Sequence, residues 1–260
     1  MWDPGQYRKF IGERSRPFYE LIGRIGAENP RFVVDLGCGP GDMTAELARR
    51  WPSAGVLGVE NSAEMIEAAG AISVPGLRFE RADVRDWQPD RPVDVLVASA
   101  LLQWVPGHES LLPRWVGWLT GGGWLAFNIP GNFDSPAHVL LRKLASSARW
   151  RPLLRDALLN RQARDPADYL DVLAGEGCAV DAWETTYLQV LAGDEPVLEW
   201  YKGSALRPVI AALDADQAAE FIADYAALLR QAYPRRTYGT VLPFRRVFVV
   251  ARRPPSATPA

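Results

Sequence analysis

Apolar residues recur along the chain in short runs, and each run is bounded by polar residues, glycine or proline. Runs of this length that are rich in β-branched residues predict strands. The run VDVLVAS at 93–99 is apolar at nearly every position, as a central parallel strand is. The predicted strands cover residues 32–36, 55–60, 77–82, 93–99, 124–129, 179–191 and 244–251.

Helical patterns lie between most of these strands. Pro52 ends the first of them, and Ser62 with Glu64 marks the start of the second. Strands that alternate with helices form right-handed βαβ units. The sequence therefore predicts an α/β fold with a doubly wound, mostly parallel sheet. The predicted helices cover residues 41–51, a segment that begins at Ser62, 108–119 and 166–174.

Two segments, 131–165 and 193–242, are rich in arginine and aromatic residues and are too long for plain loops. We interpret them, together with about residues 1–25, as a helical cap over the sheet of a single domain, 1–260. Trp2, Tyr7 and Phe10 are spaced as an apolar stripe, which suggests that the N-terminal arm closes over the sheet as a lid. We expect the tail 254–260 to be disordered.

Composition and charge exclude several classes of protein. Of the 260 residues, 48% are hydrophobic and 23% are charged, which is ordinary for a soluble globular protein. The net charge of −2 gives no electrostatic case for a nucleic-acid or membrane partner. Two cysteines and two histidines form no disulfide framework and no metal-ligand spacing. With no apolar run near 18 residues and no apolar signal core, we expect a cytoplasmic protein without a metal, whose oligomeric state is open.

The stretch VVDLGCGPGDM, residues 33–43, ends the first predicted strand in a glycine-rich turn. In a doubly wound sheet, ligands bind beyond the carboxyl ends of the strands. A dinucleotide loop of the form G-x-G-x-x-G would have its third glycine where Asp42 stands. Asp35 and Asp42 would oppose a pyrophosphate, but they suit a ligand with an ammonium and a sulfonium group. S-adenosylmethionine is such a ligand, and we predict it as the cofactor.

Carboxylates also follow the next two strands. Glu60 is placed to accept hydrogen bonds from both ribose hydroxyls, although an acidic residue there also suits NAD. Asp83 can accept a hydrogen bond from the adenine amino group. The alternative is a structural glycine turn with surface carboxylates, which does not explain why these residues all fall at successive strand ends. The predicted cofactor-binding residues are Asp35, Gly37, Cys38, Gly39, Gly41, Glu60, Asn61, Met65, Asp83, Val84 and Ser99.

The motif V-D-L-G-C-G-P-G, with acidic residues at the next two strand ends, resembles class I S-adenosylmethionine-dependent methyltransferases over about residues 30–130. A narrower resemblance spans nearly the whole chain and is to the trans-aconitate 2-methyltransferase family. It rests on R-x-R-P at 14–17, D-W-Q-P at 86–89, L-Q-W-V-P at 102–106, W-x-T-T-Y at 183–187 and F-x-V-A-R-R at 248–253. The resemblance implies a seven-stranded, Rossmann-like methyltransferase sheet. It also implies an enzyme that forms the monomethyl ester of trans-aconitate or a related small polycarboxylate.

Such a reaction needs little chemistry from side chains. A carboxylate is already ionised at pH 7, so no general base is required, and we predict no catalytic residue beyond those that position the reactants. Arginine suits a polycarboxylate because it binds carboxylates in a bidentate manner. Each candidate arginine could instead be a solvated surface charge, and each aromatic candidate could be core. The predicted substrate-binding residues are Arg14, Tyr187, Trp200, Arg207 and Arg246, and Gln103 and Trp104 are predicted to line the pocket.

Three other functions stay open at this point. The first is a methyltransferase that acts on another small molecule or on a carrier-bound malonyl carboxylate. A carrier substrate predicts an exposed basic docking face, whereas a small polyacid predicts buried arginines. The second is an NAD-dependent oxidoreductase, against which Asp42 and the lack of a Tyr-x-x-x-Lys pair argue. The third is a cofactor-binding module without activity, which only a turnover assay separates from an enzyme.

Overall fold

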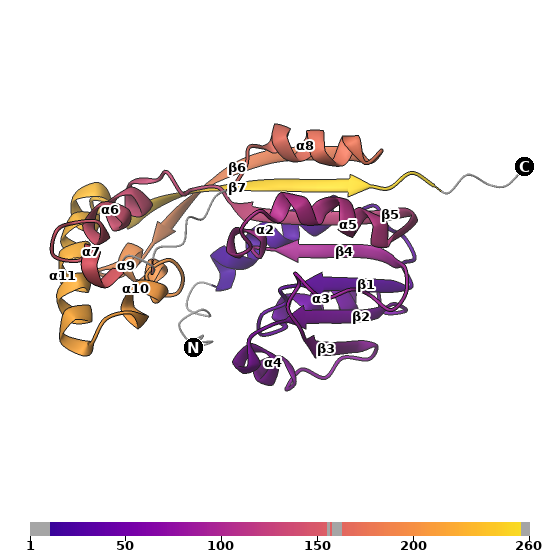
Figure 1. Cartoon of the computed structure of the whole chain (residues 1–260), viewed down its shortest axis with the longest axis horizontal. Helices are drawn as coiled ribbons and strands as arrows, with labels where there is room; N and C mark the ends of the chain where they lie inside the picture. Colours follow the sequence, from indigo (N-terminus) through magenta and orange to yellow (C-terminus); the bar gives the residue numbers. More distant parts are fainter. Residues whose placement is uncertain (1–10, 155–156, 158–162, 256–260) are drawn as a thin grey trace, which may run out of the picture.

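The computed structural model describes residues 11–154, 157 and 163–255. These residues form one seven-stranded sheet with the strand order β3-β2-β1-β4-β5-β7-β6 (Figure 1). The first five strands are parallel, and β7 runs antiparallel to both of its neighbours. The predicted α/β fold with a mostly parallel, seven-stranded sheet is confirmed. The strands are β1 Phe32–Leu36, β2 Gly55–Glu60, β3 Leu77–Arg81, β4 Val93–Ser99, β5 Leu119–Pro130, β6 Ala179–Leu191 and β7 Thr240–Arg252.

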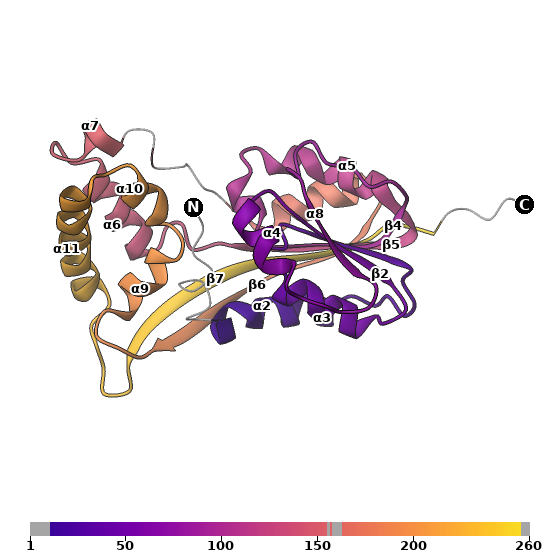
Figure 2. The ribbon, with the colours of Figure 1, turned by 90° about the horizontal axis from the view of Figure 1, so that it is seen from below.

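Helices cover both faces of the sheet because the central strands are apolar on both sides (Figure 2). Val33 faces the side where α2 and α3 pack, with Phe18 and Leu47. Val34 faces the opposite side, where α5 and α8 contribute Trp115 and Tyr169. The helices on these faces are α2 Ile11–Gly23, α3 Asp42–Arg50, α4 Ala63–Ala69, α5 Leu111–Trp118 and α8 Pro166–Gly175.

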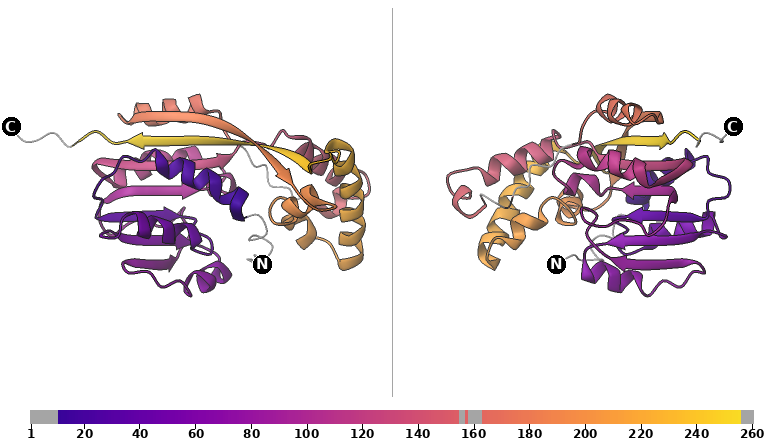
Figure 3. Two further views of the ribbon diagram at one scale, coloured as in Figure 1. Left: turned by 180° about the vertical axis from the view of Figure 1, so that it is seen from behind. Right: turned by 45° about the vertical axis from the view of Figure 1, so that its right-hand side comes forward.

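A second hydrophobic cluster lies at one end of the molecule, where β6 and β7 extend beyond the other strands (Figures 1 and 3). Trp200, Tyr201 and Phe221 are buried there, against Leu242 and Phe244 of β7. The cluster draws residues from both predicted cap segments, 131–165 and 193–242, and their role as a cap stays a prediction. Its helices are α6 Pro136–Ala145, α7 Arg151–Leu154, α9 Pro196–Lys202, α10 Arg207–Ala211 and α11 Ala215–Ala232.

The predicted start of the fifth strand at residue 124 is wrong, because β5 begins at Leu119. The three consecutive glycines at 121–123 lie inside the strand and do not precede it. The register shifts, with Val93 opposite Leu119 and Val95 opposite Trp124, so the glycines form a bulge inside β5.

Two further boundaries need correction. The predicted helix 108–119 begins as a short 3-10 helix, η2 His108–Ser110, and α5 starts only at Leu111. Pro113 lacks the N–H that would bond back to residue 109, so an α-helix cannot include that bond. The last strand begins at Thr240 rather than at 244, because its pairing with β6 continues past Pro243 as far as Thr240.

Gly58 of β2 supports the glycine loop from behind. A Cβ added there would lie 2.6 Å from Phe79 Cδ1 and 2.9 Å from Cys38 Sγ. We expect Gly58→Ala to lower the free energy of unfolding by about 1–3 kcal/mol, because overpacking forces neighbouring groups apart. Urea unfolding measures the effect. Gly117→Ala in α5 is the control, since nothing lies within 4 Å of its added Cβ; equal stability of the two variants would contradict the expected crowding.

Candidate functional site

A cavity of about 470 Å³ lies at the carboxyl ends of the parallel strands. That volume is in the range of small-molecule sites. Every predicted cofactor-binding residue except Gly41 lines it. Of the other predicted site residues, Gln103, Trp104, Trp200 and Arg246 line it as well. Residues that we did not predict also contribute to the wall, among them Ser15, Phe18, Arg85, Ala100, Ser204 and Phe244.

The glycine loop has three glycines with positive φ. Two of them are also closely packed, and the third faces open space. At Gly37, φ is 71° and an added Cβ would lie 2.8 Å from a Leu101 side-chain carbon. At Gly41, φ is 83° and an added Cβ would lie 2.6 Å from Phe79, so this glycine serves packing and does not line the cavity. At Gly39, φ is 55° and an added Cβ would meet nothing within 4 Å. The loop backbone at Gly39 therefore faces open space, which leaves room for a ligand.

Asp35 is a buried carboxylate at the start of this loop, and its side chain is only 3% exposed. The pKa of Asp35 is raised to about 7, chiefly by burial; the hydrogen bond from Thr44 opposes the rise, and the nearby charge of Glu60 adds to it. The Thr44 hydroxyl donates to Asp35 Oδ2 at 2.7 Å. A cation bound beside Asp35 would favour its ionised form.

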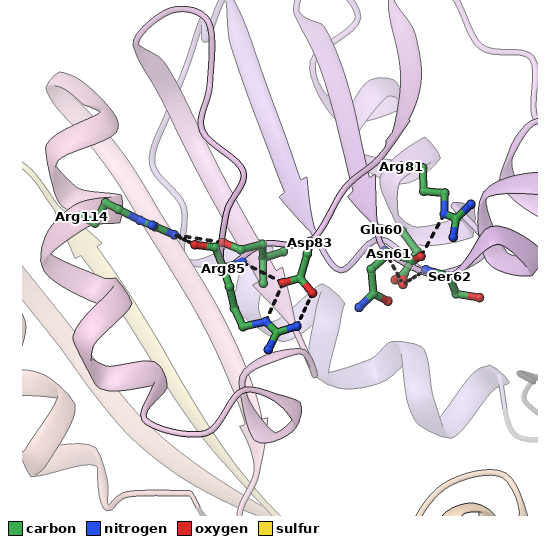
Figure 4. A network of polar contacts seen from close by, with 8 residues as sticks. Glu60, Asn61, Ser62, Arg81, Asp83, Arg85 and Arg114 are labelled. Carbon is green, nitrogen blue, oxygen red and sulfur yellow. Dashed lines mark hydrogen bonds and ion pairs between the residues drawn. The ribbon is translucent and has the colours of Figure 1, made fainter.

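Glu60, at the end of β2, is held by backbone N–H groups (Figure 4). Its Oε1 accepts hydrogen bonds from the N–H groups of Asn61 at 2.8 Å and Ser62 at 2.9 Å. Its Oε2 accepts from the N–H of Gly39 at 3.2 Å. The carboxylate is thus fixed at the mouth of the loop. Oε1 already accepts two hydrogen bonds, so the further lone pair for a ligand is on Oε2.

Asp83, after β3, is paired with an arginine that the sequence analysis did not single out (Figure 4). The Arg85 guanidinium donates to Oδ1 at 2.9 Å and to Oδ2 at 2.6 Å. This hydrogen-bonded ion pair lowers the pKa of Asp83 to about 2. Arg114 of α5 donates to the carbonyl oxygens of Val84 and Arg85, which fixes the turn. A ligand at Asp83 would therefore share the carboxylate with Arg85.

The loop after β4 carries Gln103 and Trp104, in the 3-10 helix η1 Leu102–Trp104. Ala100 has a φ of 54°, which is uncommon for a residue other than glycine. The side-chain amide of Gln103 donates to the Ala100 carbonyl oxygen and so holds this strained turn. Backbone strain of this kind is typical of functional sites. Both predicted pocket residues, Gln103 and Trp104, follow this turn and line the cavity.

The predicted substrate residues are only partly brought together. Trp200 of α9 and Arg246 of β7 line the cavity, whereas Tyr187 and Arg207 do not. The side chain of Arg14 lies outside the described part of the structure. The same holds for the predicted lid residues Trp2, Tyr7 and Phe10.

Tyr187 has a structural partner that sequence reasoning missed. Its hydroxyl donates to Glu20 of α2, and the same carboxylate accepts from Trp183 Nε1 at 3.2 Å and from Thr185 Oγ1 at 2.9 Å. The W-x-T-T-Y motif thus binds α2 to β6, and α2 in turn brings Ser15 and Phe18 to the cavity. Trp183, Thr185 and Tyr187 alternate along the strand and so point to one face, which is the available signal for a shared partner. The sequence does not identify that partner, because Glu20 lies 163 residues before Trp183.

The described residues contain no group of histidine, cysteine and carboxylate side chains that could hold a metal ion. Among these residues, no helix is both long enough and apolar enough to cross a membrane.

Similarity to known proteins agrees with this geometry. A family model described as a methyltransferase domain matches residues 33–123. The trans-aconitate 2-methyltransferase of Streptomyces avermitilis is 50% identical to this chain, over 97% of each protein. That of Rhodococcus jostii is 53% identical, over 97% of this chain and 99% of the relative.

Solved structures share the fold at low sequence identity. The YcgJ protein from Bacillus subtilis has a TM-score of 0.57 at 15% identity, and the match covers 90% of this chain and 96% of that one. The cyclase SpnF has a TM-score of 0.58 at 14% identity, with 98% and 87% covered. The fold and the site define a Rossmann-like class I methyltransferase. Within that class, the chain belongs to the trans-aconitate 2-methyltransferase family.

The raised pKa of Asp35 predicts a pH dependence of stability. The folded state holds this proton more tightly than the unfolded state, whose pKa is 3.8. Asp35 therefore stabilises the fold most at low pH, and this contribution falls as the pH rises from about 4 to about 7. Asp35→Asn removes the slope, so the stability of the ligand-free variant relative to the wild type should rise by up to about 1.4 kcal/mol per pH unit in that window.

Urea unfolding at a series of pH values measures this difference. Asp83→Asn is the matched control, because the pKa of Asp83 is about 2 and its titration lies below the window. Parallel stability curves for the wild type and Asp35→Asn between pH 4 and pH 7 would show that Asp35 is ionised throughout.

Proposed function

We propose that the protein is an S-adenosylmethionine-dependent carboxyl O-methyltransferase that forms the monomethyl ester of trans-aconitate or of a related small polycarboxylate. The observation that carries the proposal is the position of Arg246. This buried guanidinium lines the same cavity as the carboxylates at the strand ends. The membership of the chain in its family supports the identity of the acid.

The cofactor half of the cavity suits a cationic ligand without a phosphate. Glu60 is close enough to Asp35 to disfavour the ionisation of Asp35 further, and an ammonium or sulfonium group would offset that repulsion. Glu60 can accept from a ribose hydroxyl through Oε2, and Asp83 with the backbone of Val84 can bind the adenine edge. The open space at Gly39 allows the close backbone approach that such a ligand needs.

When bound, S-adenosylmethionine supplies an electrophilic methyl group. The described residues that line the cavity include no histidine, lysine or tyrosine that could act as a general base. None is needed, because the acceptor carboxylate is ionised at pH 7. The residues of the chain hold the acid in line with the methyl group and exclude water, and such positioning can supply roughly 7–11 kcal/mol of the barrier.

The charges of the cavity favour an anionic substrate at the β7 side. Arg246 is 7% exposed, and its guanidinium lies over the Phe244 ring at 5.1 Å. A buried arginine of this kind binds a carboxylate in a bidentate manner. We infer that Arg246 holds a carboxylate that is not methylated, since a tightly paired carboxylate is a poor nucleophile. Trp200 and Ser204 form the adjacent wall.

A cytoplasmic location and the lack of a nucleic-acid partner, both expected from the sequence, remain part of this proposal. So does the contribution of Arg14 to the substrate site.

Turnover tests the proposal directly. The protein is incubated with labelled S-adenosylmethionine and one of five acceptors: trans-aconitate, its cis isomer, citrate, a monocarboxylic acid and a carrier-bound malonyl group. We expect a clear preference for trans-aconitate and a product heavier by one methyl group, identified by mass. Equal slow rates on all the acids, or activity on the carrier-bound group alone, would overturn the proposal.

Arg246 should matter mainly for the acid. We expect Arg246→Ala to raise the KM for trans-aconitate by a factor that corresponds to about 1.5–3 kcal/mol of binding free energy, the usual worth of a hydrogen bond to a charged group. Arg246→Lys should recover only part of the loss, because lysine cannot form the bidentate contact. Steady-state kinetics with saturating cofactor measures both variants.

Arg245→Ala is the matched control. Arg245 is the neighbouring residue of β7, but it is paired with Glu184 and Asp165 and does not line the cavity. A KM that rises as much for Arg245→Ala as for Arg246→Ala would mean that general charge, not the contact, attracts the acid.

A further inference from the structure

Three polar side chains cross the sheet at the floor of the cavity, one from each of β4, β5 and β7. Ser99 is the register partner of Asn128, and Arg246 lies diagonally across from Asn128, opposite Pro130. Asn128 is fully buried, whereas Ser99 and Arg246 both line the cavity. Asn128 was not among the predicted site residues, and it connects two that were.

Hydrogen bonds join the three side chains in a chain of fixed direction. Arg246 Nη1 donates to Asn128 Oδ1 at 3.0 Å, and Asn128 Nδ2 donates to Ser99 Oγ at 2.9 Å. A guanidinium has donors only, so the carbonyl oxygen of Asn128 must face Arg246 and its NH₂ group must face Ser99. Ser99 Oγ is therefore an acceptor toward Asn128, and its own proton can be donated to another group.

Asn128 is uncharged, which also matters for how Arg246 can bind an anion. One of the five N–H donors of Arg246 binds Asn128, which orients the guanidinium but leaves its charge in place. An aspartate at this position would form an internal, buried ion pair with Arg246. That added negative charge would lie beside the guanidinium, and a substrate carboxylate would have to compete with it.

We propose that Asn128 is a positioning residue that determines the specificity of the site for carboxylate substrates. It orients the Arg246 guanidinium without neutralising it, and it turns the Ser99 hydroxyl into a donor for an anionic oxygen in the cavity. A carboxylate of the substrate accepts from both groups. This inference rests on the proposed function, because it concerns the acid that the site binds.

The test replaces Asn128 by aspartate, which has nearly the same shape. The dissociation constant of trans-aconitate is measured by calorimetry on the protein loaded with S-adenosylhomocysteine, and KM and kcat are measured with S-adenosylmethionine. For Asn128→Asp we expect the dissociation constant and the KM of trans-aconitate to rise at least tenfold. We expect kcat at saturating acid, and the dissociation constant of S-adenosylhomocysteine, to change less than threefold.

Two further variants separate charge from damage. Asn128→Ala removes the orientation but not the charge of Arg246, so its loss of acid affinity should be smaller than that of Asn128→Asp. Asn132→Asp makes the same chemical change at a buried asparagine whose side chain donates to Tyr201 and does not line the cavity. Its affinity for trans-aconitate should stay within threefold of the wild type.

The outcomes distinguish this inference from the proposed function. If the wild type methylates trans-aconitate and Asn128→Asp binds the acid equally well, the role of Asn128 is wrong and the proposed function stands. Equal losses of acid and cofactor affinity would also overturn the role, since they indicate structural damage. If the wild type binds the cofactor but neither binds nor methylates any acid, the proposed function itself fails.

Discussion

The antiparallel insertion of β7 between β5 and β6 is the constraint on which the site depends. The parallel strands end at the cavity, but β7 begins there, so its first half carries residues to the same edge of the sheet. Phe244 and Arg246 reach the cavity for this reason. A seventh parallel strand would present the residues of its other end at this edge, and the cavity would lack its buried cation.

The resulting cavity is divided by charge. Carboxylates gather at the ends of β1 to β3, and the buried guanidinium lies across from them on β7. A cation bound at Asp35 and an anion bound at Arg246 would each reduce the cost of burying the charge that the protein presents to it. Their mutual attraction in a site of low dielectric would add to this effect, so the two ligands should support one another's binding.

The sequence predicts well which residues line the carboxylate-rich half of the cavity, because most of them lie at or just after the end of a strand. Gly41 shows the limit even there, since its contact with Phe79 depends on how the loop packs on β3. The half of the cavity around Arg246 was predicted less well, since Tyr187 and Arg207 do not line it. Whether Arg207 or Arg246 reaches the cavity depends on packing between segments far apart in the chain. The partner that orients Arg246, Asn128, is visible only once strand order and register are known.

The place of β7 in the sheet also has a consequence for biosynthesis. During translation the strands of the cofactor half emerge first, and β5 remains an open edge until the final strand has left the ribosome. Helix α2, made first of all the described elements, cannot complete its hydrogen bonds through Glu20 before β6 exists. The nascent chain can thus form the strands that carry the carboxylates early, but the cavity gains Arg246 only after β7, the last strand, has been made.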